Sequence, residues 1–128
     1  MSVVGIGTDI VEISRLADMS NDAKNRLVNR ILTNDEQVKY QSLNSNTQNA
    51  FLAKRWAAKE AAAKSLGTGI ADGVSFQHIE IKSLPSGKPE LILTGRALEI
   101  AKSLTATSWH ISLSDEKKYA TAFVVLSN

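Results

Sequence analysis

Two short segments carry the residues whose types and spacing could do chemistry. The first, Phe51 to Gly69, reads FLAKRWAAKEAAAKSLGTG, and its only acid, Glu60, precedes Lys64 by four residues. Residues four apart are neighbours on one face of a helix, so this segment predicts a carboxylate beside an ammonium. Such a pair could bind a cation and an anionic group, or it could be an ordinary helical salt bridge worth about 0.3–0.5 kcal/mol.

The second segment is a predicted N-terminal strand, Val3 to Ile10, with the sequence VVGIGTDI. Alternation along a strand places Gly5, Gly7 and Asp9 on one face. Two glycines weaken a strand unless something must approach that face closely, and Asp9 could there hold a hard cation or a polar ligand. Asp9 could equally cap a helix that starts near Glu12, because aspartate is a favoured cap residue.

The helices and strands expected around these segments predict a single domain, residues 1–128. It belongs to the α+β class, with helices packed against an antiparallel sheet. Helices are expected at 22–31, at 34–43 behind a capping box at 33–36, from 51 to the glycines at 67 and 69, and at 95–104. Strands are expected at 3–10, 76–82, 90–93, 108–113 and 119–126, and a surface loop at 44–47.

The composition excludes some kinds of site and favours others. With no cysteine among 128 residues, disulfides and thiolate metal sites are excluded. The net charge is only +2, yet Lys24, Arg26 and Arg30 lie near Arg15, where a phosphate-bearing cofactor or an acidic protein could bind. Nucleic acid fits less well, because aromatic residues are few and no run of arginine and lysine occurs. The sequence shows neither a signal peptide nor a membrane span, so a cytoplasmic protein is expected.

Together, GTDIVEISRL near the start and FLAKRWAAKEAAAKSLGTGI in the middle resemble the holo-acyl-carrier-protein synthases, the small single-domain branch of the 4′-phosphopantetheinyl transferases. The residues that match the two motifs of this family are Gly7, Asp9, Ile10, Arg15, Trp56, Lys59, Glu60, Ala61, Lys64, Gly67 and Gly69. Gly87-Lys88-Pro89 and the final segment, His110 to Leu126, follow in the family's order. The resemblance therefore spans nearly the whole chain and implies the phosphopantetheinyl transferase fold.

The resemblance implies an enzyme that moves 4′-phosphopantetheine from coenzyme A to a serine of apo acyl carrier protein and releases 3′,5′-ADP, in fatty acid biosynthesis. It implies a Mg²⁺ ion held by Asp9 and Glu60, with Mn²⁺ as the other candidate. Glu60 and Lys64 are the expected catalytic residues. Lys64 is expected to pair with a phosphate oxygen, and the base is either Glu60 or a metal-held water.

The expected contacts to coenzyme A come from the motif helix, a later turn and a C-terminal strand: Lys64, Arg55, Lys59, Gly87, Lys88, Pro89 and His110. Lys59 ranks above Arg55 because it belongs to the motif. A tight turn is by itself a complete explanation of 87–89, and His110 could be a purely structural strand residue. Asp115 stands where many relatives carry a second histidine, so no role passes to it.

Two further expectations concern partners. The family assembles as a homotrimer with sites between protomers, and an acidic carrier protein is expected to dock on Arg15 and Arg26. Two alternatives to the fatty-acid reading stay open. One is a transferase that serves a polyketide or other specialised carrier, and the other is a non-catalytic module that binds coenzyme A or a carrier protein.

Overall fold

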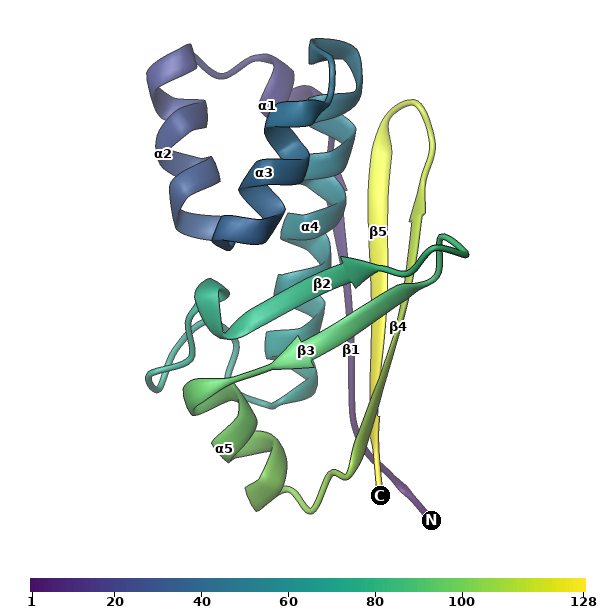
Figure 1. The fold of residues 1–128 in the computed structure, drawn as a ribbon. Coiled ribbons are helices and arrows are strands. Elements are labelled where there is room, and N and C mark those ends of the chain that lie inside the picture. The colour runs from purple at the N-terminus through teal and green to yellow at the C-terminus, as the bar shows by residue number, and fades with distance from the viewer.

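The structure is a computed structural model that describes all residues, 1–128, and it confirms the α+β class (Figure 1). Its helices and strands form a helical end, a long central helix, a three-stranded sheet and a separate hairpin. The elements in chain order are β1 Val3–Glu12, α1 Ser14–Ala17, α2 Asn21–Ile31, α3 Asn34–Ser42, α4 Ser45–Ser65, β2 Ile79–Ser83, β3 Pro89–Leu93, α5 Gly95–Ser103, β4 Ser108–Asp115 and β5 Tyr119–Ser127.

The main sheet is antiparallel, with the strand order β1-β5-β4. β5 therefore lies in the middle, and the two ends of the chain lie side by side at one end of the sheet (Figure 1). In register, Asp9 of β1 lies opposite Ala122 of β5, which in turn lies opposite Leu113 of β4. The strands β1 and β4 are thus the opposite edges of one sheet. Asp9 on β1 and His110 on β4 therefore lie on different edges.

The central helix α4 covers one face of this sheet, against β1 and β5. The side chains of Ala57, Ala58 and Ala61 are fully buried there, because small residues let the helix lie close to the strands. Gly5 and Gly7 make the same approach possible from the strand: a Cβ at either would collide with a carbonyl oxygen of α4. No helix of the structure combines the length and the apolar character needed to cross a membrane.

The hairpin β2–β3 forms a second, two-stranded sheet that crosses in front of α4 (Figure 1). Its inward side chains, including Ile81 and Leu91, are buried in the same core as the helix. Trp109 of β4 ties the hairpin to the main sheet, since its Nε1 donates to the carbonyl oxygen of Leu91 at 2.9 Å.

Two local expectations from the sequence are wrong because a polar side chain satisfies the backbone differently, and one of the two alternatives left open for Asp9 is excluded. Residues 45–47 are the first turn of α4, because Asn44 is the N-cap and its side chain accepts from the Thr47 amide. The strand expected from Phe76 begins only at Ile79, since Phe76–His78 form a 3₁₀ turn capped by Ser75. Asp9 does not cap a helix, because β1 continues past it to Glu12.

Candidate active site

The first group of candidate residues lies where β1 meets the C-terminal half of α4. Strand alternation turns Asp9 to the same face as Gly5 and Gly7, toward the helix, as expected from the sequence. The Asp9 carboxylate accepts a hydrogen bond from Lys64 Nζ at 2.9 Å, and the same ammonium donates to the Thr8 carbonyl oxygen at 3.0 Å. The structure therefore brings the strand aspartate and the helix lysine together.

The helical salt bridge between Glu60 and Lys64 that the spacing allowed is absent from the structure. Lys64 pairs with Asp9 instead, which leaves Glu60 beside Asp9 without a lysine partner of its own. Burial raises the pKa of Glu60, and the negative charge of Asp9 raises it further. The positive charges of Lys64 and Arg30 and the neighbouring Trp56 act against that rise of the Glu60 pKa.

The chemistry of this donor set fits a small divalent cation. Two carboxylates that repel each other across a partly buried site are relieved when a cation lies between them. No group of three or more histidine, aspartate and glutamate side chains is arranged so that it could hold a metal ion. Mg²⁺ retains several waters and needs only one or two protein carboxylates, so Asp9 and Glu60 are a sufficient pair for that ion.

Lys59 lies in the interior, where it cannot serve as the expected contact to coenzyme A. Its side chain is fully buried, and its Nζ donates to Glu36 Oε1 and to the carbonyl oxygens of Ile31 and Phe76. Three oxygens therefore take all three ammonium protons. Burial lowers the pKa of Lys59, and the charge of Glu36 acts against that fall.

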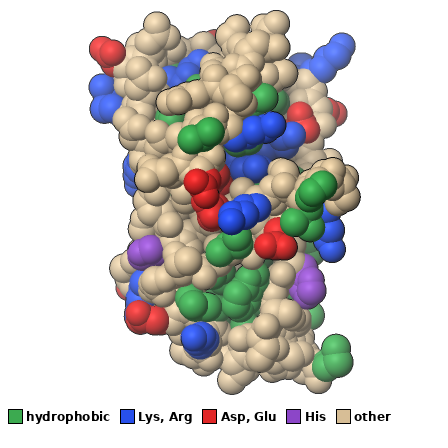
Figure 2. Space-filling model, viewed as in Figure 1, with side chains coloured by type: hydrophobic (Ala, Val, Ile, Leu, Met, Phe, Trp, Pro, Cys, Tyr) green, Lys and Arg blue, Asp and Glu red, His purple; other side chains and the backbone are tan.

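Arg55 is also buried, yet its guanidinium reaches a surface hollow. Nε lies 3.5 Å from Glu36 Oε2, and Nη2 donates to Ser83 Oγ at 3.4 Å. The hollow has a volume of about 350 Å³ and lies between α3 and β2. Figure 2 shows acidic and basic side chains gathered on this face, and the lining residues are Asp35, Glu36, Lys39, Arg55, Glu80, Ile81, Lys82 and Ser83.

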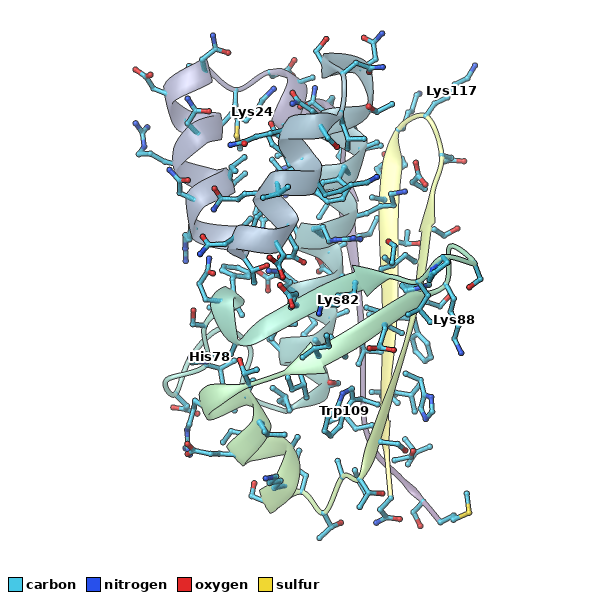
Figure 3. All side chains as sticks on the ribbon, in the orientation of Figure 1. Lys24, His78, Lys82, Lys88, Trp109 and Lys117 are labelled. Carbon is cyan, nitrogen blue, oxygen red and sulfur yellow. The ribbon has the colours of Figure 1, made fainter.

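The residues expected to bind the cofactor from the later turn and strand lie together in a second hollow. Lys88, Pro89 and His110 line a hollow of about 230 Å³ beside Trp109. Figure 3 shows Lys88 on the hairpin and Trp109 between β3 and β4. Gly87 occupies the turn with a φ of +89° and nothing near its Cβ position.

The hairpin residues and Arg55 form one continuous strip. Arg55 contacts Ser83 at the end of β2, and Ser83 lies in register with Pro89, which lines the hollow with His110. This strip borders β4, whereas Asp9 lies on β1 at the opposite edge of the sheet. Within one chain, the structure therefore separates the carboxylate pair from the hairpin contacts.

The residues expected to meet a carrier protein lie on α1 and α2, the short helices that pack against α4. Arg15 of α1 is exposed, with its guanidinium carbon 4.9 Å from the centre of the Trp56 ring. Arg26 of α2 is exposed as well. Trp56 lies one helical turn before Glu60 on α4, so Arg15 packs on the turn that precedes Glu60.

The histidine His78 and the aspartate Asp115 both have structural partners. His78 Nδ1 accepts from the Ser75 amide and helps to close the 3₁₀ turn. Asp115 pairs with Lys54 of α4 at 3.3 Å, at the end of β4. Neither residue lies with the carboxylate pair.

Sequence reasoning missed Glu36, the carboxylate that contacts both Arg55 and Lys59. The sequence identifies Glu36 only as a member of a capping box, and the structure confirms that box with Thr33. A glutamate three residues after a capping threonine does not by itself indicate a buried ion pair. The additional partners of Glu36 come from α4 and β2, far away in the chain.

Comparisons with known proteins identify the family of the chain. The family model of the 4′-phosphopantetheinyl transferase superfamily matches residues 5–124. The holo-[acyl-carrier-protein] synthase of Marinomonas sp. (strain MWYL1) is 49% identical over 127 residues, which are 98% of each chain. The crystal structure of the Neisseria meningitidis holo-[acyl-carrier-protein] synthase aligns with a TM-score of 0.87 and 38% identity, over 99% of this chain and 100% of that one.

A further solved structure contains a ligand. The Helicobacter pylori holo-[acyl-carrier-protein] synthase in complex with coenzyme A aligns with a TM-score of 0.80 and 30% identity, over 95% of this chain and 99% of that one. Family model, sequence and fold therefore agree over almost the whole length. The chain belongs to the holo-[acyl-carrier-protein] synthase family of the 4′-phosphopantetheinyl transferase superfamily.

Proposed function

We propose that this chain transfers 4′-phosphopantetheine from coenzyme A to a serine of an apo acyl carrier protein, releases 3′,5′-ADP, and so makes holo acyl carrier protein for fatty acid biosynthesis. The observation that carries the proposal is the juxtaposition of Asp9, Glu60 and Lys64 in a chain of this family. Two carboxylates and one ammonium can together hold a cation and the anionic pyrophosphate of coenzyme A.

Asp9 and Glu60 are the proposed metal ligands, and Mg²⁺ is the proposed ion. When bound, such an ion lowers the repulsion between the pyrophosphate and its attacker and stabilises the leaving phosphate. The mutual repulsion of the two carboxylates supports this role, because a cation is the group that relieves it.

The remaining roles belong to Lys64 and Glu60. As the serine oxygen bonds to the β-phosphorus, the bond from that phosphorus to the 3′,5′-ADP oxygen breaks. Lys64 then places a positive charge on the phosphate oxygens, since its side chain is half exposed and able to leave Asp9. The acceptor of the serine proton is Glu60 itself or a metal-held water.

The strip of Arg55, Gly87, Lys88, Pro89 and His110 is the proposed site for the other phosphate of coenzyme A, the one on the ribose that leaves as the 3′-phosphate of 3′,5′-ADP. Three side chains there can carry or share positive charge beside a hollow. Lys59 is not part of this proposal, because its ammonium is enclosed by protein oxygens.

A homotrimer with sites between protomers is the proposed assembly. The sheet face that α4 leaves uncovered exposes Ile6, Ile10 and Phe123, at 61%, 59% and 46%, and a second copy could bury them. The separation of the carboxylate pair from the hairpin strip also supports sites completed by a neighbour. The proposed carrier-protein dock is the exposed pair Arg15 and Arg26. A cytoplasmic location stays a prediction from the sequence.

The deciding experiment is intact-mass spectrometry of apo acyl carrier protein after incubation with this protein, coenzyme A and Mg²⁺. We expect a mass gain of one phosphopantetheine, lost with a chelator, with Asp9→Ala and with Glu60→Ala. Circular dichroism of both variants checks that they are folded. No gain with several carriers, from folded protein that binds coenzyme A, would leave the binding module as the function. A gain with polyketide carriers alone would favour the specialised transferase.

A further inference from the structure

Glu36 has more partners than its place in a capping box requires. The residue is 3% exposed, and its Oε1 accepts from the Thr33 amide at 2.9 Å and from Lys59 Nζ at 2.5 Å. Its Oε2 accepts from the Ile81 amide at 3.0 Å and lies 3.5 Å from Arg55 Nε. The box uses only the Thr33 contact, so the other three contacts serve something else.

The position of Arg55 indicates the role of these three additional contacts of Glu36. Its guanidinium carbon lies 4.6 Å from the centre of the Phe51 ring, so the ring covers one face of the group. Glu36 closes the Nε side, although Nε makes no hydrogen bond. Nη2 is directed at Ser83, where the strip beside the hairpin begins. Arg55 is thus held between a ring and a carboxylate, with its outer nitrogens left for another partner.

We propose that Glu36 is a positioning residue for coenzyme A: its buried carboxylate holds Arg55 in the orientation that takes the ribose phosphate. This proposal rests on the function proposed above and adds a residue that does not touch the cofactor. An arginine side chain loses much rotamer freedom when it binds a ligand, and a side chain fixed beforehand does not incur that loss again.

The charge of Glu36 matters as well as its shape. Burial lowers the pKa of Arg55, and Glu36 and Glu80 act against that fall. Burial of Arg55 and Lys59 together needs negative charge nearby, and Glu36 supplies it to both. A neutral glutamine at position 36 keeps the shape but removes that charge, which loosens the hold on Arg55.

A set of matched variants tests the proposal by calorimetric titration of coenzyme A and of 3′-dephospho-coenzyme A. Glu36→Gln alone leaves the Lys59 ammonium without a carboxylate and so risks unfolding. The double variant E36Q/K59M removes the whole buried pair and keeps the charge balanced. The control K59M leaves Glu36 facing Arg55, and Arg55→Met removes the positioned group itself. Thermal melting is recorded for each variant.

We expect E36Q/K59M to bind coenzyme A about tenfold more weakly than K59M does. The two proteins should bind 3′-dephospho-coenzyme A with equal affinity. In the Arg55→Met background, adding E36Q/K59M should cause no further loss of affinity for coenzyme A, because a positioning residue acts only through its partner. Transfer at saturating coenzyme A should stay within about twofold of K59M, which separates KM from kcat.

If the role of Glu36 is purely structural, E36Q/K59M will melt at a lower temperature than K59M but bind coenzyme A and 3′-dephospho-coenzyme A as tightly as K59M does. That result overturns the proposal. The proposal also fails if Arg55→Met binds coenzyme A normally, although the transferase function would then still stand. Failure of the proposed function is distinguishable, because the wild-type protein would then bind no coenzyme A or modify no carrier.

Discussion

Lys64 Nζ lies 2.9 Å from the carboxylate of Asp9, a residue 55 positions earlier in the chain. This contact joins the C-terminal half of α4 to β1 and occupies a carboxylate that a metal ion would also bind. Lys64 has a second partner in the Thr8 carbonyl oxygen, so its ammonium is held on the strand rather than along its own helix. The proposed site therefore contains a built-in competitor for the cation.

Lys64→Ala is expected to lower transfer and to tighten cation binding at the same time. Transfer should fall roughly 10–100-fold, because a positive charge on the phosphate oxygens is lost. Binding of Mn²⁺ to the protein without coenzyme A, measured by electron paramagnetic resonance, should become tighter because Asp9 is released. Lys102→Ala on α5 is the control for the change in net charge. Weaker Mn²⁺ binding in Lys64→Ala would mean that Lys64 orients Asp9 for the metal.

Glu60 should make the metal-free protein depend on pH. Its pKa in the folded protein is raised above 4.5 by burial and by Asp9, so the folded state holds the proton more tightly than the unfolded chain. Stability should then be lost as the pH rises from about 4.5 through the folded pKa. Glu60→Gln has no such proton, so its metal-free form should melt roughly 1–3 °C higher at neutral pH, a small rise because solvent screens the repulsion.

Melting curves between pH 4 and pH 8, with and without Mg²⁺, check this expectation. Mg²⁺ should raise the melting temperature of the wild-type protein and leave that of Glu60→Gln almost unchanged. If the wild-type protein is the more stable one at every pH without metal, Trp56 and Lys64 outweigh burial and Asp9.

Local patterns were enough to predict the elements that carry the site. The alternation in β1 correctly placed Asp9 with Gly5 and Gly7 on one face, and the glycines correctly implied a close neighbour, which is α4. The capping box at Thr33 is confirmed as well. In each case the signal lies within a few residues, where backbone geometry alone decides the outcome.

Partners that come from distant segments could not be predicted. The spacing of Glu60 and Lys64 suggested a pair along the helix, but β1 supplies the partner of Lys64. Lys59 was expected to contact coenzyme A and is instead enclosed by Glu36 and two carbonyl oxygens. Helix periodicity gives the face of a residue, while the element packed against that face is set by tertiary structure.

Arg15→Glu is expected to weaken carrier-protein binding and spare coenzyme A. The KM for acyl carrier protein should rise roughly tenfold, because an exposed cation that faces an acidic partner mainly assists encounter. The defect should shrink in high salt, which screens exposed charges. Lys102→Glu on α5, at the opposite end of the molecule in Figure 1, is the control with the same change in charge. Equal loss of coenzyme A binding would remove Arg15 from the docking surface.

Gly7→Ala should destabilise the protein by about 3 kcal/mol or more. A Cβ at this position collides with the carbonyl oxygen of Ala61, so β1 must move away from α4 and take Asp9 with it. Gly87→Ala is the control: it faces open space, and its φ of +89° should cost only about 1 kcal/mol. Urea unfolding measures both. A Gly7→Ala protein as stable as the wild type would mean that the contact between β1 and α4 is loose.

Mixed oligomers test whether each site is shared between protomers. Asp9→Ala removes a proposed metal ligand on β1, and Arg55→Met removes a proposed phosphate contact beside Ser83 at the end of β2. Each variant alone should be defective at low coenzyme A. In co-expressed mixtures, some interfaces combine the intact Asp9 of one protomer with the intact Arg55 of its neighbour. Random pairing in a closed ring makes about a quarter of the interfaces intact, so transfer should recover to about that fraction.

The same mixture distinguishes the alternatives because each predicts a different yield. If one chain supplied both residues, every site would carry one defect and co-expression would restore nothing. Phe123→Glu places a charge on the exposed sheet face and should prevent assembly, as measured by light scattering. That substitution should also abolish the recovery, since the proposed neighbour would then be missing. Full transfer by monomeric Phe123→Glu with Asp9 and Arg55 intact would show that transfer needs no neighbour, and the exposed face would then have another partner.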